Sequence, residues 1–146
     1  RFEIIGTTRD ITVIDDFGHH PTAIRETLRG LRHQYPGRRL WAIFEPRSAS
    51  SCRRVFQGAF ADAFGSADQV VIAPVFRSAL PEAERLSGPA LVADLTARGV
   101  AARSAVSVDE IVGWVAADAR AGDEVVVMSN GGFGGIHGRL LEALTP

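Results

Sequence analysis

The chain has 146 residues, of which 46% are hydrophobic and 23% are charged, and its formal net charge is −1. These values favour one folded domain over a disordered chain, and they exclude the strong positive field that attracts nucleic acid or an anionic membrane. The apolar runs, such as residues 125–128, are too short to span a bilayer. We therefore expect a cytoplasmic protein that binds neither nucleic acid nor membrane.

Residue types that are rare or absent narrow the chemistry further. The one cysteine, Cys52, cannot form an internal disulfide or a cysteine metal cluster. All 16 basic residues are arginine, so the chain lacks the lysine that a Walker-type phosphate loop requires. Residues 1–6 already have the pattern of a strand, and we expect the chain to be one domain of a longer protein.

Strand and helix patterns alternate along the chain. Alternating or β-branched residues predict six strands, near residues 2–6, 11–15, 40–44, 70–73, 100–106 and 124–128. Helical spacing predicts five helices, each with one apolar face. The apolar positions are Ala23, Ile24, Leu28 and Leu31 in the first helix; Val55, Phe56, Ala59, Phe60 and Ala63 in the second; Leu91, Val92 and Leu95 in the third; Ile111, Val112 and Val115 in the fourth; and Ile136, Leu140 and Leu144 in the fifth.

This order of elements predicts a Rossmann-like three-layer α/β domain that covers residues 1–146. Only residues 7–10 separate the first two strands, so these should form an antiparallel pair. The later strands alternate with helices, which implies right-handed crossovers and a mostly parallel sheet of about six strands. Ligands of such sheets bind at the carboxyl ends of the strands, and three segments lie there: 15–21, 45–51 and 129–137.

The first segment crowds two acids and two histidines before a helix that should begin at Pro21. These side chains can cap the helix, or they can contact a ligand. A metal site, as in a metal-dependent hydrolase, is the weakest alternative, because adjacent side chains of an extended segment diverge. The four residues are Asp15, Asp16, His19 and His20.

The second segment ends the third strand and leads into a helix. Arg47 offers a planar fork for a carboxylate or a phosphate, and Ser48 and Ser51 offer donors near the positive end of that helix. Taken alone, the segment also fits a capped helix start with Arg47 in solvent.

The third segment is rich in glycine, with five glycines among residues 131–138. Its spacing does not fit the dinucleotide fingerprint G-x-G-x-x-G, because His137 stands three residues after Gly134. The glycines fit either a tight strand-to-helix turn or a backbone that a ligand approaches closely, and their number favours close approach. Phe133 would then be an apolar lid or contact.

Taken together, these segments resemble the C-terminal domain of the Mur ligases along the whole chain. The matching motifs are RFE (residues 1–3), DDFGHHPT (15–22), FEPRS (44–48) and SNGGFGGIH (129–137). The histidine loop is also similar to the branch of the family that attaches L-alanine, whereas the last two motifs resemble the branch that attaches a murein tripeptide.

The resemblance implies an ATP-dependent ligase of three domains, with this chain as the C-terminal one. The missing N-terminal domain would hold UDP-N-acetylmuramate, and the missing central domain would carry the phosphate loop and hold Mg²⁺. In the tripeptide branch, ATP phosphorylates the muramyl carboxylate, and the amine of L-Ala-γ-D-Glu-meso-diaminopimelate attacks the acyl phosphate during peptidoglycan recycling. Closure of this domain would exclude water from the acyl phosphate, and the isolated domain should be inactive.

The resemblance also implies roles for individual residues. Arg1 would reach the ATP, and Asp16 would bind the nucleotide ribose. No catalytic residue and no metal ligand is expected in this chain. The expected substrate-binding residues are Phe17, His19, His20, Glu45, Arg47, Ser48, Ser51, Ser129, Asn130, Gly131, Gly132, Phe133 and His137.

Two positions separate the branches of the family. The L-alanine branch has arginines where this chain has Ser48 and Ser51, so the resemblance favours a longer peptide, with Arg47 as the substitute anion contact. Ala49 and Ser50 depart from the Asn-Thr pair of the tripeptide branch, and some peptide contacts should differ there. An L-alanine ligase domain and a free-standing Rossmann-like nucleotide-binding module remain the alternatives.

Overall fold

The computed structural model describes residues 2–48, 51–75 and 80–146. In these residues six strands form one sheet in the order β1-β2-β6-β3-β4-β5, in which β1 and β2 are antiparallel and the other neighbouring pairs are parallel. This confirms the predicted mostly parallel sheet with an opening antiparallel pair. The strands are β1 (Phe2–Thr8), β2 (Ile11–Asp16), β3 (Leu40–Phe44), β4 (Gln69–Ile72), β5 (Ala101–Ser104) and β6 (Glu124–Met128).

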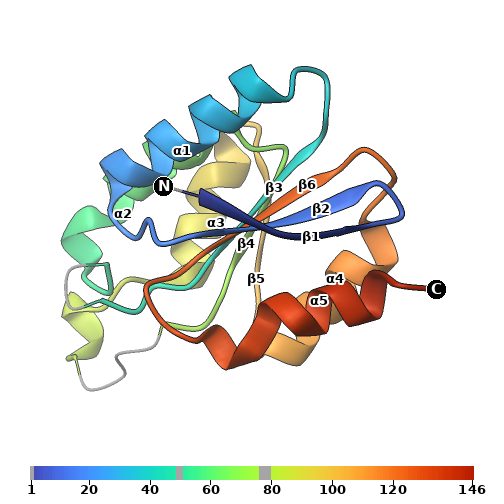
Figure 1. Cartoon of the computed structure of the whole chain (residues 1–146). Helices are drawn as coiled ribbons and strands as arrows, with labels where there is room; N and C mark the ends of the chain where they lie inside the picture. Colours follow the sequence, from blue (N-terminus) through green and yellow to red (C-terminus); the bar gives the residue numbers. More distant parts are fainter. Residues whose placement is uncertain (1, 49–50, 76–79) are drawn as a thin grey trace.

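The α-helices of the described residues cover both faces of the sheet (Figure 1). Helices α1, α2 and α3 pack on one face, and α4 and α5 pack on the other. This is the predicted three-layer α/β arrangement. The helices are α1 (Pro21–Gln34), α2 (Gln57–Ala63), α3 (Gly88–Ala97), α4 (Val108–Asp118) and α5 (Ile136–Leu144).

Side chains that alternate along the strands build a separate apolar core on each face of the sheet. In β6, Val126 and Met128 join the cluster beneath α1, α2 and α3, whereas Val125 and Val127 join the cluster beneath α4 and α5. Every residue of β3 and β6 is buried. Strands that are buried on both faces read as continuous apolar runs, which is why both were predicted with their correct bounds.

The predicted apolar faces of the first two helices are partly wrong. Ala23 is exposed, as is Ala59, and Val55 has 77% of its surface exposed. A short 3-10 turn, η1 (Arg54–Phe56), precedes α2. Such a turn has three residues per turn instead of 3.6, so it shifts the helical period on which the prediction of the second face relied.

The fifth strand is shorter than the predicted 100–106, because β5 ends at Ser104 and Val106 is 81% exposed. The turns around it form as expected. Gly99 has a φ of 84° after α3, and the Ser107 hydroxyl accepts a hydrogen bond from Glu110 N (3.1 Å) at the start of α4. None of the helices in the described ranges combines the length and the apolar character needed to cross a membrane.

A buried carboxylate ties together the amino ends of β3 and β6. The Asp123 side chain is 3% exposed and accepts hydrogen bonds from Trp41 Nε1 (2.9 Å), Arg120 N (2.9 Å) and Arg39 Nη2 (2.8 Å). Burial by itself would raise the pKa of Asp123, but these hydrogen bonds and the charge of Arg39 outweigh burial and lower the pKa. The charged form of Asp123 therefore stabilises the fold at the edge opposite to the predicted ligand site.

We expect Asp123→Ala to lower the free energy of unfolding by about 2 kcal/mol at pH 7, because buried donors lose their acceptor. Asp123→Asn keeps an acceptor oxygen, so it should lower the free energy of unfolding by less. The folded pKa lies below the unfolded value of about 3.9, so the stabilisation is complete above that value and is lost as the pH falls through the folded pKa. Urea unfolding at pH 7 and at about pH 3 measures the difference between wild type and Asp123→Ala. A difference that does not shrink at the lower pH would contradict this role.

Candidate functional site

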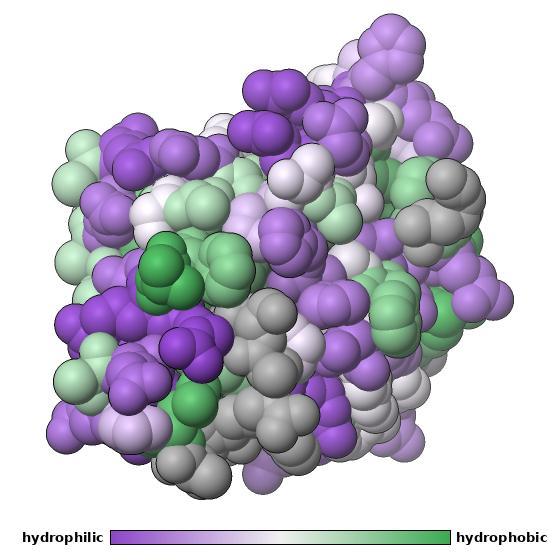
Figure 2. All heavy atoms as spheres, turned by 90° about the vertical axis from the view of Figure 1, so that its left-hand side faces the viewer, coloured by the Kyte–Doolittle hydropathy of each residue, from purple (hydrophilic) through white to green (hydrophobic). Residues whose placement is uncertain are grey.

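The three segments predicted from the sequence meet at the carboxyl edge of the sheet. β6 lies between β2 and β3, and Asp16 and Phe44 both stand beside Met128 in register. Beyond the strands, Ser129 N donates to Asp16 O (3.2 Å) and Glu45 N donates to Met128 O (3.0 Å). Figure 2 views the molecule from this side and shows hydrophilic and hydrophobic residues interspersed. The loops after β2, β3 and β6 therefore share one surface.

Asp16 anchors the loop between β2 and α1. Its side chain is 1% exposed, and Oδ2 accepts hydrogen bonds from Gly18 N (3.1 Å) and Thr27 Oγ1 (3.2 Å). A Cβ atom at Gly18 would lie 2.5 Å from this oxygen, so a larger residue would have to displace the carboxylate. The carboxylate is buried, and in this conformation it orients its loop and does not face the solvent.

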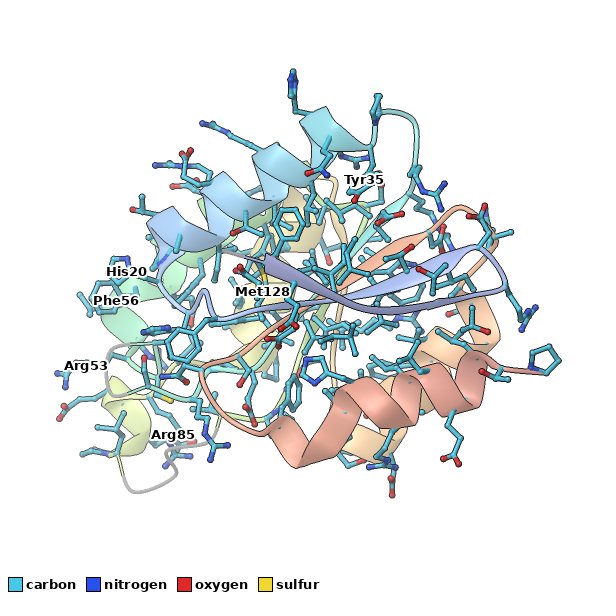
Figure 3. The ribbon with its side chains drawn as sticks, viewed as in Figure 1. His20, Tyr35, Arg53, Phe56, Arg85 and Met128 are labelled. Atoms are coloured by element: carbon cyan, nitrogen blue, oxygen red, sulfur yellow. The ribbon has the colours of Figure 1, made fainter. Side chains whose placement is uncertain are left out.

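The side chains of the histidine loop form ring pairs and do not cap α1. The helix begins at Pro21 as predicted, but the side chain of His20 at the N-cap makes no capping hydrogen bond. The His20 ring instead packs edge-on against Phe56, with 5.7 Å between the centroids (Figure 3). His19 packs in the same way against Phe17 (5.6 Å), which is 63% exposed. These rings give the edge an aromatic surface on which a planar ligand group can stack.

A buried carboxylate joins the loop after β3 to the loop after β6. Glu45 is 8% exposed, and its Oε1 accepts a hydrogen bond from Ser129 Oγ (2.6 Å). Arg47 Nη1 lies 3.7 Å from the same oxygen, and Gly131 N donates to Ser129 Oγ (3.1 Å). The guanidinium of Arg47 is thus held at the edge of the sheet while 30% of its side chain stays exposed. A guanidinium held in this way can bind a carboxylate or a phosphate.

The sequence predicted that a ligand approaches the glycine-rich loop closely, but at Gly131 the group that approaches is the side chain of Arg47. A Cβ atom at Gly131 would lie 2.1 Å from Arg47 Nε and 2.4 Å from Arg47 Cδ. The arginine side chain therefore occupies the space that any other residue at position 131 would need. The glycine at position 131 therefore leaves room for the Arg47 side chain and helps to set the position of its guanidinium.

Other residues of the glycine-rich loop form the turn into α5. Gly134 and Gly135 have φ values of 61° and 67°, the left-handed region that favours glycine. The prediction that Phe133 forms a lid is wrong in this structure, because its side chain is 2% exposed and belongs to the core beneath α4 and α5. We have no structural account of Gly132 and Gly138, where a Cβ atom would meet nothing within 4 Å.

The two serines of the second segment bond to each other and to the backbone. Ser51 is 1% exposed, and its Oγ accepts hydrogen bonds from Arg47 N (3.2 Å), Ser48 N (3.0 Å) and Ser48 Oγ (2.8 Å). Ser51 therefore shapes the turn that carries Arg47, and its side chain does not face the surface. Ser48 is partly exposed and remains at the surface of that turn.

A hydrogen bond between side chains that was not predicted from the sequence ties α5 to β2. His137 Nε2 lies 2.7 Å from Asp15 Oδ1, so His137 faces a side chain of the protein. The residues are far apart in sequence, and no motif pairs them. Asn130 is partly buried in the same loop, and Arg1 lies outside the described residues. Within the described ranges, no three His, Cys, Asp or Glu side chains are grouped as metal ligands.

We expect Gly131→Ala to displace the side chain of Arg47, because the new methyl group would occupy the same space. Gly132→Ala is the matched control, since a Cβ atom there meets nothing within 4 Å. The position of the Arg47 Nε–H signal in proton–nitrogen NMR spectra reports the displacement. This signal should move in the first variant and stay in place in the second, and equal spectra for both variants would contradict the contact.

Comparisons with known proteins identify the family of the chain. Residues 1–131 match the family model of the Mur ligase, glutamate ligase domain. The chain is 38% identical, over 99% of its length, to the UDP-N-acetylmuramate–L-alanyl-γ-D-glutamyl-meso-2,6-diaminoheptandioate ligase of Escherichia coli strain K12. It is 39% identical, over 90% of its length, to the UDP-N-acetylmuramate–L-alanine ligase of Desulfitobacterium hafniense strain Y51. It spans 30% and 29% of these relatives, respectively.

A solved structure of a single domain has the same fold as this chain. It is a domain from a putative UDP-N-acetylmuramate:L-alanyl-γ-D-glutamyl-diaminopimelate ligase of Haemophilus ducreyi, 36% identical and with a TM-score of 0.77. The match covers 99% of this chain and 100% of that chain, so a domain of this extent folds apart from the rest of its protein in that relative. The family model and the structural match together lead to one conclusion: the chain belongs to the Mur ligase family.

Proposed function

We propose that the chain is the C-terminal domain of an ATP-dependent ligase that joins UDP-N-acetylmuramate to L-Ala-γ-D-Glu-meso-diaminopimelate. Family membership supports this function, as does the 38% identity, over 99% of this chain, to a relative whose name contains that reaction's substrates. UDP-N-acetylmuramate, the tripeptide and ATP are the proposed partners, together with the N-terminal and central domains. The proposed setting is peptidoglycan recycling in the cytoplasm.

The observation that carries the peptide assignment is the position of Arg47. Its guanidinium lies against Gly131 and 3.7 Å from the buried carboxylate of Glu45, yet 30% of the side chain is exposed. An arginine that is already held in place loses little side-chain entropy when it binds an anion. A murein tripeptide offers several carboxylates to this guanidinium. Ser48 and Ser51 are uncharged, and their hydroxyl groups bond to each other. Arg47 is therefore the cation of this turn.

In the proposed reaction, this domain binds the peptide and covers the reacting groups. The central domain would hold Mg²⁺ and the phosphates of ATP, where the ion neutralises charge during phosphoryl transfer. The loops at the carboxyl edge of this chain would hold the peptide so that its amine meets the acyl phosphate, and closure would exclude water from that intermediate. The isolated domain is accordingly proposed to be inactive.

The nucleotide is proposed to lie beside the loop after β2. Asp16 fixes this loop through Gly18 and Thr27, and thereby orients the rings of Phe17 and His19. Arg1, as the resemblance implies, would reach the ATP from the start of the domain. The predicted contacts that are proposed to lie on the peptide side are Phe17, His19, His20, Glu45, Arg47, Ser48, Ser129, Asn130, Gly131 and Gly132.

An L-alanine ligase is the second candidate, because a relative of that name is 39% identical over 90% of this chain. A substrate panel on the full-length enzyme decides between the two. Our proposal predicts turnover of the tripeptide with a kcat/KM well above that for L-alanine. Turnover of L-alanine alone would replace the proposed function by the second one, and a chain with no ligase activity in its full-length form would favour a nucleotide-binding module.

In the full-length enzyme we expect Asp16→Ala to raise the KM for ATP and Arg47→Ala to raise the KM for the tripeptide. Each effect should be about tenfold, the size of a lost hydrogen bond to a charged group, which Arg47 would make to the tripeptide and Asp16 makes to its own loop. Asp16→Asn keeps an acceptor for Gly18 N, so it should restore the KM for ATP if Asp16 acts by positioning the loop. Steady-state kinetics with each substrate varied in turn give these values. Equal effects of both alanine variants on both substrates would contradict the division.

A further inference from the structure

A pocket of about 500 Å³ lies at the carboxyl ends of β4 and β5, beside the first residues of α3. Its volume is within the range of sites for small ligands. None of the three segments that the sequence indicated contributes a residue to its lining. The pocket nevertheless opens on the same edge of the sheet as Arg47, because β4 and β5 run parallel to β3.

The wall of the pocket continues directly from the turn that carries Arg47. Leu86 N donates to Cys52 O (2.8 Å), and the backbones of Arg53 and Arg85 form an isolated antiparallel β-bridge. Figure 3 shows Arg53 and Arg85 at this end of the molecule, below His20 and Phe56. The segment after Arg47 thus lies beside the segment that leads into α3. A ligand that leaves Arg47 along the edge of the sheet arrives at the pocket.

The pocket combines charges of both signs with an apolar wall. Arg54, Arg85 and Glu82 line it, together with the hydroxyl-bearing residues Ser87 and Ser104. Arg54 Nε donates to Arg85 O (3.4 Å), which keeps the first arginine beside the second. Most of the remaining lining is apolar. This composition fits a zwitterionic group, with a carboxylate and an ammonium, at the end of a short aliphatic chain.

The spacing of the strands fits a peptide of the proposed length. The Arg47 guanidinium lies against Gly131, between the loops after β3 and β6, and the pocket lies at the ends of β4 and β5. Neighbouring strands lie about 4.8 Å apart, so the two places are about 10 Å apart along the edge. One extended residue spans about 3.4 Å. A peptide with one carboxylate on Arg47 therefore reaches the pocket about three residues further on, whereas free L-alanine cannot contact both.

We propose that this pocket binds the free amino-acid end of the diaminopimelate residue. Arg54 and Arg85 would bind its carboxylate, Glu82 would accept a hydrogen bond from its ammonium group, and the apolar wall would pack against its methylene groups. The inference rests on the proposed function, which identifies the peptide. It assigns to this pocket the selection of the third residue, a task that Arg47 alone does not perform.

The test compares two tripeptides in the full-length ligase, one ending in meso-diaminopimelate and one ending in L-lysine. The lysine peptide lacks the distal carboxylate. Arg54→Gln should lower kcat/KM for the diaminopimelate peptide by about tenfold or more, towards the wild-type value for the lysine peptide. The values of kcat/KM for the lysine peptide and of KM for ATP should stay unchanged in Arg54→Gln. Arg53→Gln is the matched control, because Arg53 pairs with Glu84 (3.6 Å) and does not line the pocket.

The outcomes separate this inference from the proposed function. A wild-type enzyme that uses neither tripeptide would overturn both. A wild-type enzyme that uses the tripeptides, with Arg54→Gln behaving like Arg53→Gln or losing equal activity on both peptides, would overturn only the assignment of the pocket. Equal wild-type values of kcat/KM for the two peptides would also overturn only the assignment of the pocket.

Discussion

The hydrogen bond between Ser129 Oγ and Glu45 Oε1 (2.6 Å) is the contact on which the rest of the proposed peptide site depends. It joins the loop after β6 to the loop after β3, and the same carboxylate oxygen faces Arg47. Parallel pairing of β3 and β6 brings these loops to the same level of the sheet. A buried carboxylate needs such partners, because an unpaired charge away from water is costly. The loop geometry and the position of the guanidinium are therefore set together.

The same principle operates on the other side of β6. Asp16 is buried at the end of β2 and holds its loop through Gly18 and Thr27. The carboxyl edge thus carries two buried acids that orient more exposed side chains, the rings of Phe17 and His19 on one side and Arg47 on the other. Ligand groups would meet side chains whose positions are fixed before binding, which lowers the entropic cost of binding.

The sequence was sufficient for the sheet, for the start of α1 at Pro21 and for the three loops at its carboxyl edge, because buried parallel strands and a proline at the first helical turn leave strong local patterns. It was not sufficient for contacts between distant segments. The reason for glycine at position 131 is the side chain of Arg47, and the partner of His137 is Asp15. The pocket beside β4 and β5 is built from four separate parts of the chain, and no local motif marks such a site.

The most direct measurement is a crystal structure of the full-length ligase with the tripeptide and a non-hydrolysable ATP analogue. Our account predicts a peptide carboxylate within hydrogen-bonding distance of the Arg47 guanidinium, with the contacts of Arg47 to Gly131 and Glu45 retained. A tripeptide bound away from the loops after β3 and β6, or an Arg47 side chain turned out into solvent in the complex, would contradict the account.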